Sequence, residues 1–232
     1  MTLGRSLRAR YEVFSFSFTV CRGRCESSLG WYLDLCAWTF VEELILRKLK
    51  LQMQMSINGF VAGPKGEMDW MVWNWDQRLK DYVSDLTRPV DCIVLGRVLA
   101  EGFIPAWKES VEKDPADEFA RKMNGTPKLV FSKTPSATKW DRATFAKGPL
   151  AEEINALKAA SGGDIIAYGG STLASELIRH ALIDEYYLFV NPTALRDGMS
   201  IFREPALVSM KLSSAVAFDC GIVCLKYVPH SN

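Results

Sequence analysis

The stretch IIAYGGST at residues 165–172 joins a short apolar run to a pair of glycines and two hydroxyl residues. The run at 165–168 predicts a buried strand that Gly169 and Gly170 stop, and residues 171–180 have the spacing of a helix. Residues without a β-carbon let the backbone approach a ligand, and the free amides of a helix N-terminus favour an anion. The stretch therefore predicts a phosphate site that needs both glycines, with a simple tight turn as the alternative.

Strand-like and helix-like segments alternate on both sides of this stretch. The pattern predicts further strands at 48–55, 91–95, 128–131, 185–190, 209–218 and 221–227. It predicts further helices at 73–86, 116–123 and 150–160. The last two strands follow each other without a helix and should form a hairpin. The sequence thus predicts an α/β fold with a mixed, mostly parallel sheet, helices on both faces and a C-terminal antiparallel hairpin.

Two other predicted strands end in a residue pair that suits an anion. Gly96 and Arg97 follow one strand, and Ser132 and Lys133 follow another. Ligands of open α/β sheets collect at the carboxyl ends of the strands, where a cation can neutralise a dinucleotide phosphate. Each cation taken alone is equally well explained as a solvated surface charge. Together with the glycine pair, the two cations favour one anionic cofactor.

Composition and charge exclude several classes of protein. The formal net charge of +1 offers no basic surface for nucleic acid, so we expect no nucleic-acid partner. Cys92 lies in an apolar run, where a reduced buried thiol is the ordinary state, and a reducing compartment such as the cytoplasm is expected. The two histidines, His180 and His230, have no zinc-ligand spacing, and no metal is predicted.

Other motifs are missing from the sequence. The most apolar segment, residues 31–46, contains Asp34, Glu42 and Glu43, so that no membrane span is expected. No strand is followed by Gly-x-Gly-x-x-Gly, and no P-loop, Gly-x-Ser-x-Gly or His-Glu-x-x-His occurs. Rossmann dehydrogenase, kinase, hydrolase and metalloprotease functions therefore have no support.

Residues 1–46 differ from the remainder of the chain. The regular alternation starts near Lys48, so we expect an N-terminal extension over 1–46 and one domain over 47–232. The arginine bias of the first thirty residues is compatible with an organelle transit peptide, and a poorly packed arm or translation from too early a start is the alternative. We expect residues 1 to about 45 to be dispensable for folding.

Four motifs in a fixed order carry a resemblance to a known family. They are Ser56–Ala62, Leu95–Arg97, Val130–Lys133 and Tyr168–Ser171. Together they resemble the dihydrofolate-reductase-like family, and more closely the C-terminal reductase domain of bifunctional riboflavin-biosynthesis deaminase-reductases in its stand-alone bacterial form. The similarity covers about residues 47 to 228. The His-x-Glu and Pro-Cys-x-x-Cys motifs of the deaminase half are absent, so deamination is not expected.

The resemblance implies a small-molecule substrate, NADPH as cofactor, and a homodimer. It places the adenosine phosphate near Gly96, Arg97, Ser132 and Lys133, the diphosphate near the glycine pair, and the nicotinamide near Gln54 and Asn58. The cofactor-binding residues that it implies are Gln54, Gly96, Arg97, Ser132, Lys133, Tyr168, Gly169, Gly170, Ser171 and Thr172.

The catalytic candidates are Asp76 and Asn58. In dihydrofolate reductases a carboxylate on the first helix serves the pterin ring, and Asp76 is the nearest candidate, although a solvated charge at a helix start is an alternative. Family members often carry aspartate where this chain has Asn58, and a threonine-aromatic pair where it has Leu99 and Ala100. The resemblance implies NADPH-dependent reduction of a pyrimidine- or pteridine-like molecule, with 5-amino-6-(5-phosphoribosylamino)uracil as reference substrate. Dihydrofolate reduction and a non-catalytic nucleotide-binding protein remain the alternatives.

Overall fold

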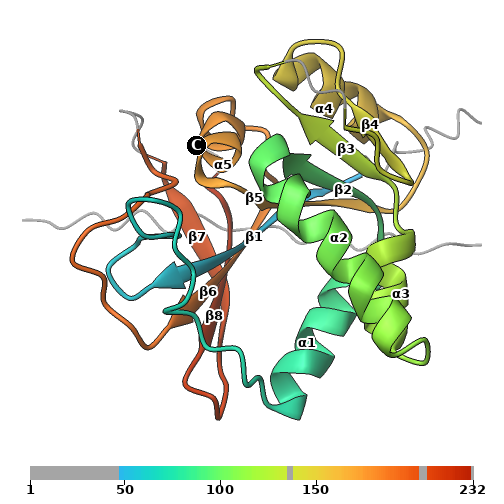
Figure 1. Ribbon diagram of the computed structural model, residues 1–232. Coiled ribbons are helices and arrows are strands. Elements are labelled where there is room, and N and C mark those ends of the chain that lie inside the picture. The colour runs from blue at the N-terminus through green and yellow to red at the C-terminus, as the bar shows by residue number, and fades with distance from the viewer. Residues whose placement is uncertain (1–46, 135–137, 204–207, 231–232) are drawn as a thin grey trace, which may run out of the picture. The chain divides into compact units, whose positions relative to one another are not determined.

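The computed structural model describes residues 47–134, 138–203 and 208–230 (Figure 1). The predictions for residues 1–46 lie outside the described residues. The strands are β1 Leu49–Ser56, β2 Val90–Gly96, β3 Lys128–Phe131, β4 Ala143–Phe145, β5 Asp164–Gly169, β6 Glu185–Asn191, β7 Met210–Ala217 and β8 Val223–Pro229. The helices are α1 Gln77–Thr87, α2 Arg97–Lys113, α3 Glu118–Gly125, α4 Leu150–Ala159 and α5 Ser171–Arg179.

These strands form one sheet in the order β4-β3-β2-β5-β1-β6-β8-β7. β1 through β6 run parallel to one another, while β8 is antiparallel to both β6 and β7. The predicted mixed, mostly parallel sheet and its C-terminal antiparallel hairpin are thus confirmed. Because the central strands are parallel, their carboxyl ends share one edge, which we call the carboxyl edge.

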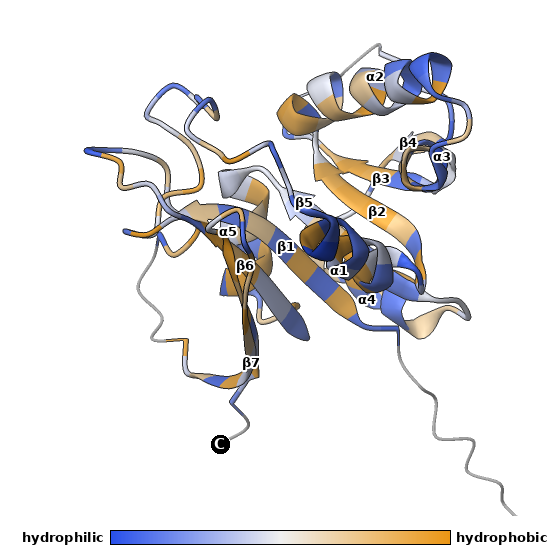
Figure 2. Ribbon diagram, turned by 90° about the horizontal axis from the view of Figure 1, so that it is seen from below, coloured by the Kyte–Doolittle hydropathy of each residue, from blue (hydrophilic) through white to orange (hydrophobic). Residues whose placement is uncertain are grey.

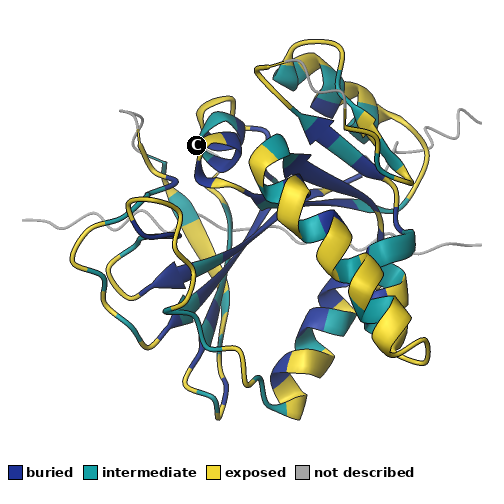
Figure 3. Cartoon of the chain, viewed as in Figure 1, coloured by how far each residue is buried: buried dark blue, intermediate teal, exposed yellow. Residues whose placement is uncertain are grey.

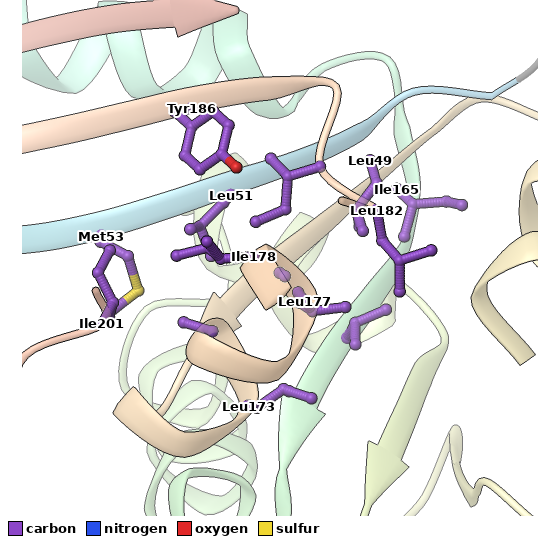
Figure 4. Packing of buried hydrophobic residues seen from close by; sticks show 14 of the residues in the cluster. Leu49, Leu51, Met53, Ile165, Leu173, Leu177, Ile178, Leu182, Tyr186 and Ile201 are labelled. Atoms are coloured by element: carbon purple, nitrogen blue, oxygen red, sulfur yellow. The ribbon is translucent and has the colours of Figure 1, made fainter. Parts of the chain in front are cut away.

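β1 shows why the alternating sequence becomes a strand. Leu49, Leu51 and Met53 face a cluster that includes α4 and α5, and Figure 4 shows Leu177 of α5 among these side chains. The residues between them point to the opposite face, where α1, α2 and α3 cover the sheet. In Figure 3 the central strands are buried, whereas the outer surfaces of α1 and α2 are exposed. Helices therefore cover both faces, as predicted.

Three elements differ from the expectation. α2 spans Arg97–Lys113, whereas the sequence predicted no helix between residues 97 and 115, because Gly102 and Pro105 look like breakers and only Ala100 and Ile104 are buried. β4 is a three-residue edge strand, too short for a periodic signal. The first helix begins at Gln77 rather than at residue 73, because Asp76 caps it.

Among the residues that the structure describes, no helix combines the length and the apolar character needed to cross a membrane. The same residues contain no group of three or more His, Cys, Asp or Glu side chains that could hold a metal ion.

Candidate functional site

The carboxyl edge brings three of the predicted motifs together. Gly96 ends β2 and lies between two strands, since it pairs with Phe131 and its neighbour Leu95 pairs with Gly169. A β-carbon added at Gly96 would lie 3.6 Å from the carbonyl oxygen of Gly169. The ends of β2, β3 and β5, with Gly96, Ser132 and Gly169, are therefore adjacent in space.

The two glycines after β5 have different roles. Gly169 has a φ of +83°, a conformation that favours glycine, and an added β-carbon would come within 2.8 Å of Met53 Sδ. Gly170 has a φ of 16°, and an added β-carbon would meet no protein atom within 4 Å. The positive φ that favours glycine is thus found at Gly169 and not at Gly170. Gly170 instead borders open space, as a ligand seat requires.

α5 starts directly after this turn. Gly170 is the N-cap residue and contributes no side-chain cap, and amides of the first helical turn have no acceptor within the helix. Ser171 is buried, while Thr172 is exposed. The amides of a helix N-terminus and its dipole favour a negative charge. The start of α5 can therefore hold a phosphate group.

Arg203 adds a cation at this helix start, which sequence reasoning missed. Its Nη2 donates to Ser171 Oγ at 2.8 Å, and its Nε donates to the carbonyl oxygen of Ser200 at 2.8 Å. These contacts place the guanidinium beside the first residue of α5. Arg203 follows no strand and belongs to no recognisable motif, so nothing in the local sequence marks it.

The two predicted cations lie at the edge, and Arg97 contacts a carboxylate. Arg97, the first residue of α2, forms a close ion pair with Glu101 one turn later. The Arg179 guanidinium beside Glu176 holds the pKa of that carboxyl below its usual range, and Lys133 contributes to this effect. An arriving phosphate would thus compete with Glu101 for Arg97.

Ser132 and Asn58 shape the loops at the edge. Ser132 Oγ donates to the carbonyl oxygen of Thr134 at 2.6 Å. Asn58 Oδ1 accepts from Ser56 Oγ at 2.8 Å and from the amide of Leu195 at 3.1 Å, and Asn58 Nδ2 donates to the carbonyl oxygen of Leu195 at 2.6 Å. Asn58 therefore holds the loop after β6 against the loop after β1.

A relay of amides fixes Gln54 near the end of β1. The backbone amide of Val72 donates to Asn191 Oδ1 at 2.9 Å, and Asn191 Nδ2 donates to Gln54 Oε1 at 2.8 Å. Asn191 is fully buried at the end of β6. Sequence reasoning missed Asn191, which is marked only by its position at the end of a predicted strand.

Asp76 has contacts typical of a structural residue. One carboxylate oxygen accepts the amide of Leu79 at 2.8 Å, and the other accepts the amide of Cys220 at 3.0 Å. Hydrogen bonds from Leu79 and Cys220 hold the pKa of Asp76 below its usual range. This geometry favours the helix-start role, and its catalytic role stays a prediction.

Tyr168 points away from the glycine turn. Its ring packs against Phe103 of α2, with centroids 5.3 Å apart, and its hydroxyl is 3.8 Å from Met123 Sδ. Burial raises the pKa of Tyr168. Its side chain therefore belongs to the packing between β5 and the helices, and only its backbone adjoins the phosphate seat.

The chain is similar to several known proteins. A family model described as RibD C-terminal domain matches residues 47–224. The uncharacterized protein YyaP of Bacillus subtilis (strain 168) is 28% identical over 182 residues, which cover 78% of this chain and 94% of that protein. The riboflavin biosynthesis protein RibD of Corynebacterium ammoniagenes is 23% identical, over 78% of this chain and 54% of that protein. The chain thus spans about half of that RibD.

Two solved structures show the same fold. One is a diaminohydroxyphosphoribosylaminopyrimidine deaminase/5-amino-6-(5-phosphoribosylamino)uracil reductase from Thermotoga maritima, with a TM-score of 0.56, 16% identity, and coverage of 80% of this chain and 57% of that one. The other is dihydrofolate reductase from Enterococcus faecalis complexed with NADP(H), with a TM-score of 0.52, 18% identity, and coverage of 79% and 97%.

Proposed function

The chain belongs to the RibD C-terminal domain family, and from this premise we propose that it is an NADPH-dependent reductase of a small pyrimidine- or pteridine-like molecule. Its relatives of reductase-like fold support an oxidoreductase, and one of them was solved with NADP(H) bound. The reference reaction is that of 5-amino-6-(5-phosphoribosylamino)uracil reductase, which the Thermotoga maritima relative carries in its name.

One observation carries the proposal, namely the open phosphate seat between β5 and α5. Gly170 leaves free space where a side chain would stand, the first-turn amides of α5 are free of helical partners, and Arg203 lies beside Ser171. A diphosphate needs this combination of backbone access, amide donors and a cation. The residues present therefore fit a dinucleotide cofactor.

When bound, NADPH supplies a hydride to an electrophilic carbon of the substrate. The chain's own residues would bind the cofactor and orient it toward the substrate. Gly169, Gly170, Ser171 and Thr172 would hold the diphosphate, and Gly96, Arg97, Ser132 and Lys133 would hold the adenosine phosphate. Gln54, whose amide is fixed by Asn191, orients the reacting rings near the end of β1. Asn58 keeps the adjoining loop in place.

Titration with NADPH tests the cofactor site. We expect saturable binding to the wild-type protein, which Gly170→Ala and Arg203→Gln each weaken by about tenfold or more. The added β-carbon of Gly170→Ala would occupy the phosphate seat, and Arg203→Gln would lose a hydrogen bond to a charged group, which contributes about 1.5–3 kcal/mol. Gly125→Ala is the matched control, because an added β-carbon there also meets nothing within 4 Å. Gly125 ends α3 just before the amino end of β3, so it lies away from the carboxyl edge. Melting temperatures of all variants separate loss of binding from loss of folding.

Turnover is then measured as NADPH oxidation with pyrimidine, pterin and quinone acceptors. Oxidation with dihydrofolate as the preferred acceptor would support a dihydrofolate reductase instead. Saturable NADPH binding without turnover on any acceptor would support a nucleotide-binding protein that kept the fold. A wild-type protein that does not bind NADPH would overturn the proposal.

A further inference from the structure

The exposed large hydrophobic side chains are concentrated at the carboxyl edge. Among the described residues, five of the six lie on segments that leave this edge, namely Ile57, Met68, Trp73, Val98 and Phe202. Figure 2 shows hydrophobic stretches between hydrophilic ones along the loops beyond the carboxyl end of β1. Single exposed apolar side chains are ordinary, whereas several that gather beside a site mark a binding surface.

Two of these side chains are anchored to one residue after β6. The amide of Ile57 donates to the carbonyl oxygen of Thr193 at 2.9 Å, and Thr193 Oγ1 donates to the carbonyl oxygen of Trp70 at 3.3 Å. Met68 precedes Trp70 by two residues, and both belong to the loop between β1 and α1. Ile57 and Met68 therefore lie in segments that meet at Thr193.

Trp73 is anchored close by through its neighbour. The Val72 amide donates to Asn191 Oδ1, and Asn191 Nδ2 donates to Gln54 Oε1. Trp73 comes directly after Val72 and is 67% exposed. It therefore follows a residue that is bonded to the amide that fixes Gln54. We call Ile57, Met68 and Trp73 the apolar rim.

The cations of the proposed phosphate site lie on the other half of the carboxyl edge. Arg97 follows β2 and Lys133 follows β3. Arg203 is bonded to Ser171 at the start of α5, directly after β5. The ends of β2, β3 and β5 thus form a cationic half of the edge.

The half with the apolar rim has no such excess of positive charge. Residues 57–76, which follow β1, hold one cation, Lys65, against the carboxylates of Glu67, Asp69 and Asp76. In the loop after β6, Arg196 is followed directly by Asp197. A phosphate group is bound by cations that form charge-assisted hydrogen bonds with it. The ends of β1 and β6 therefore suit an uncharged group better than a phosphate.

We propose that the substrate places an uncharged, apolar substituent of its planar ring against the apolar rim and carries no phosphate there. Trp73 contacts the ring or its substituent with an aromatic face, and Ile57 and Met68 exclude water from it. This inference rests on the proposed reductase function and narrows its substrate class, because the reference substrate 5-amino-6-(5-phosphoribosylamino)uracil carries a phosphate. Trp73 is then a specificity-determining residue.

A matched pair of pterins tests the inference. 6-Methylpterin and pterin-6-carboxylate have the same ring, with an apolar or an anionic substituent at the same position. Both are titrated by calorimetry against the wild-type protein in the presence of NADP⁺, so that no turnover occurs. We expect 6-methylpterin to bind about tenfold more tightly, because no cation offsets the lost hydration of the carboxylate.

Variants of the apolar rim test which residues cause this preference. Trp73→Ser and Ile57→Ser should each weaken binding of 6-methylpterin by about five- to tenfold, because each removes apolar surface that the ligand buries. The affinity for NADP⁺ should stay unchanged, and the preference over pterin-6-carboxylate should shrink.

Leu212→Ser is the matched control for both variants. Leu212 is 49% exposed, and it pairs with Tyr227, which in turn pairs with Tyr186 near the start of β6. It therefore lies away from the carboxyl edge, and its replacement should leave both pterin affinities unchanged. Melting temperatures of all variants separate loss of binding from loss of folding.

Equal affinity for the two pterins, or tighter binding of pterin-6-carboxylate, would overturn the inference. Rim variants that change the oligomeric state in analytical ultracentrifugation but not the pterin preference would also overturn it, because the apolar rim would then be an interface between copies of this chain. A wild-type protein that binds NADPH but neither pterin would overturn it and leave the cofactor proposal intact. A preference for 6-methylpterin that depends on Trp73, without NADPH binding, would support the apolar rim and refute only the reductase proposal.

Discussion

The carboxylate of Asp76 joins the start of α1 to the turn between β7 and β8, because one oxygen accepts the amide of Leu79 and the other accepts the amide of Cys220. The two contacts lie 3 and 144 residues away in the sequence. A single side chain therefore both starts the helix and fixes its distance from the C-terminal hairpin.

We expect Asp76→Asn to lower the melting temperature at pH 7, because asparagine has one acceptor oxygen for two amides. The pKa of Asp76 is lowered in the folded protein, so its carboxylate stabilises the fold above the ordinary pKa of 3.8 and this contribution is lost as the pH falls through the folded pKa. The difference in melting temperature should therefore shrink below about pH 4.

Asp81→Asn is the control for this variant, since Asp81 lies on the exposed side of α1. NADPH oxidation by Asp76→Asn below its melting temperature tests the catalytic role. Retained turnover supports the capping role, whereas a folded protein without turnover would support the catalytic role that the resemblance implied.

Gly169→Ala should destabilise the fold by about 1–3 kcal/mol, because its φ of +83° strains any residue with a β-carbon. The added atom would also meet Met53 Sδ at 2.8 Å. Urea unfolding of Gly169→Ala with and without Met53→Val separates the backbone strain from the contact with Met53. The smaller valine side chain relieves only the contact. Full recovery in the double variant would show that the backbone angle costs nothing.

Arg97→Ala should reduce the preference for NADPH over NADH by about tenfold, as expected for loss of a hydrogen bond to a charged group. Because Glu101 competes for Arg97, Glu101→Gln should strengthen NADPH binding. Lys108→Ala and Glu112→Gln form the matched control pair. These two residues also lie four positions apart on α2, but further from the carboxyl edge. Titration with both cofactors measures the ratio of the NADH and NADPH dissociation constants. The same ratio in the wild-type protein and in Arg97→Ala would exclude Arg97 from the phosphate site.

The parts of the fold that sequence predicts are those with a local cause. β1 follows from strict alternation, and the β5–α5 turn follows from two glycines after an apolar run. α2 was missed because its stability comes from packing of a narrow apolar stripe around Pro105, which a local pattern does not register.

The site residues that sequence missed depend on distant contacts. Asn191 gains its role from the Val72 amide, 119 residues away, and Arg203 gains its role from Ser171, 32 residues away. Such roles follow from topology and not from the residues beside them in the sequence.

The polar face of β1 also bears on how the chain matures. β1 lies between β5 and β6, with Lys50 paired to Ile166 on one side and to Glu185 on the other. A ribosome delivers both neighbours only after α1, α2, α3 and α4 have been made. An unpaired apolar strand is prone to aggregate during such a delay. Lys50, Gln52 and Gln54 interrupt the apolar run, so the polar side chains of β1 also protect the nascent strand from self-association.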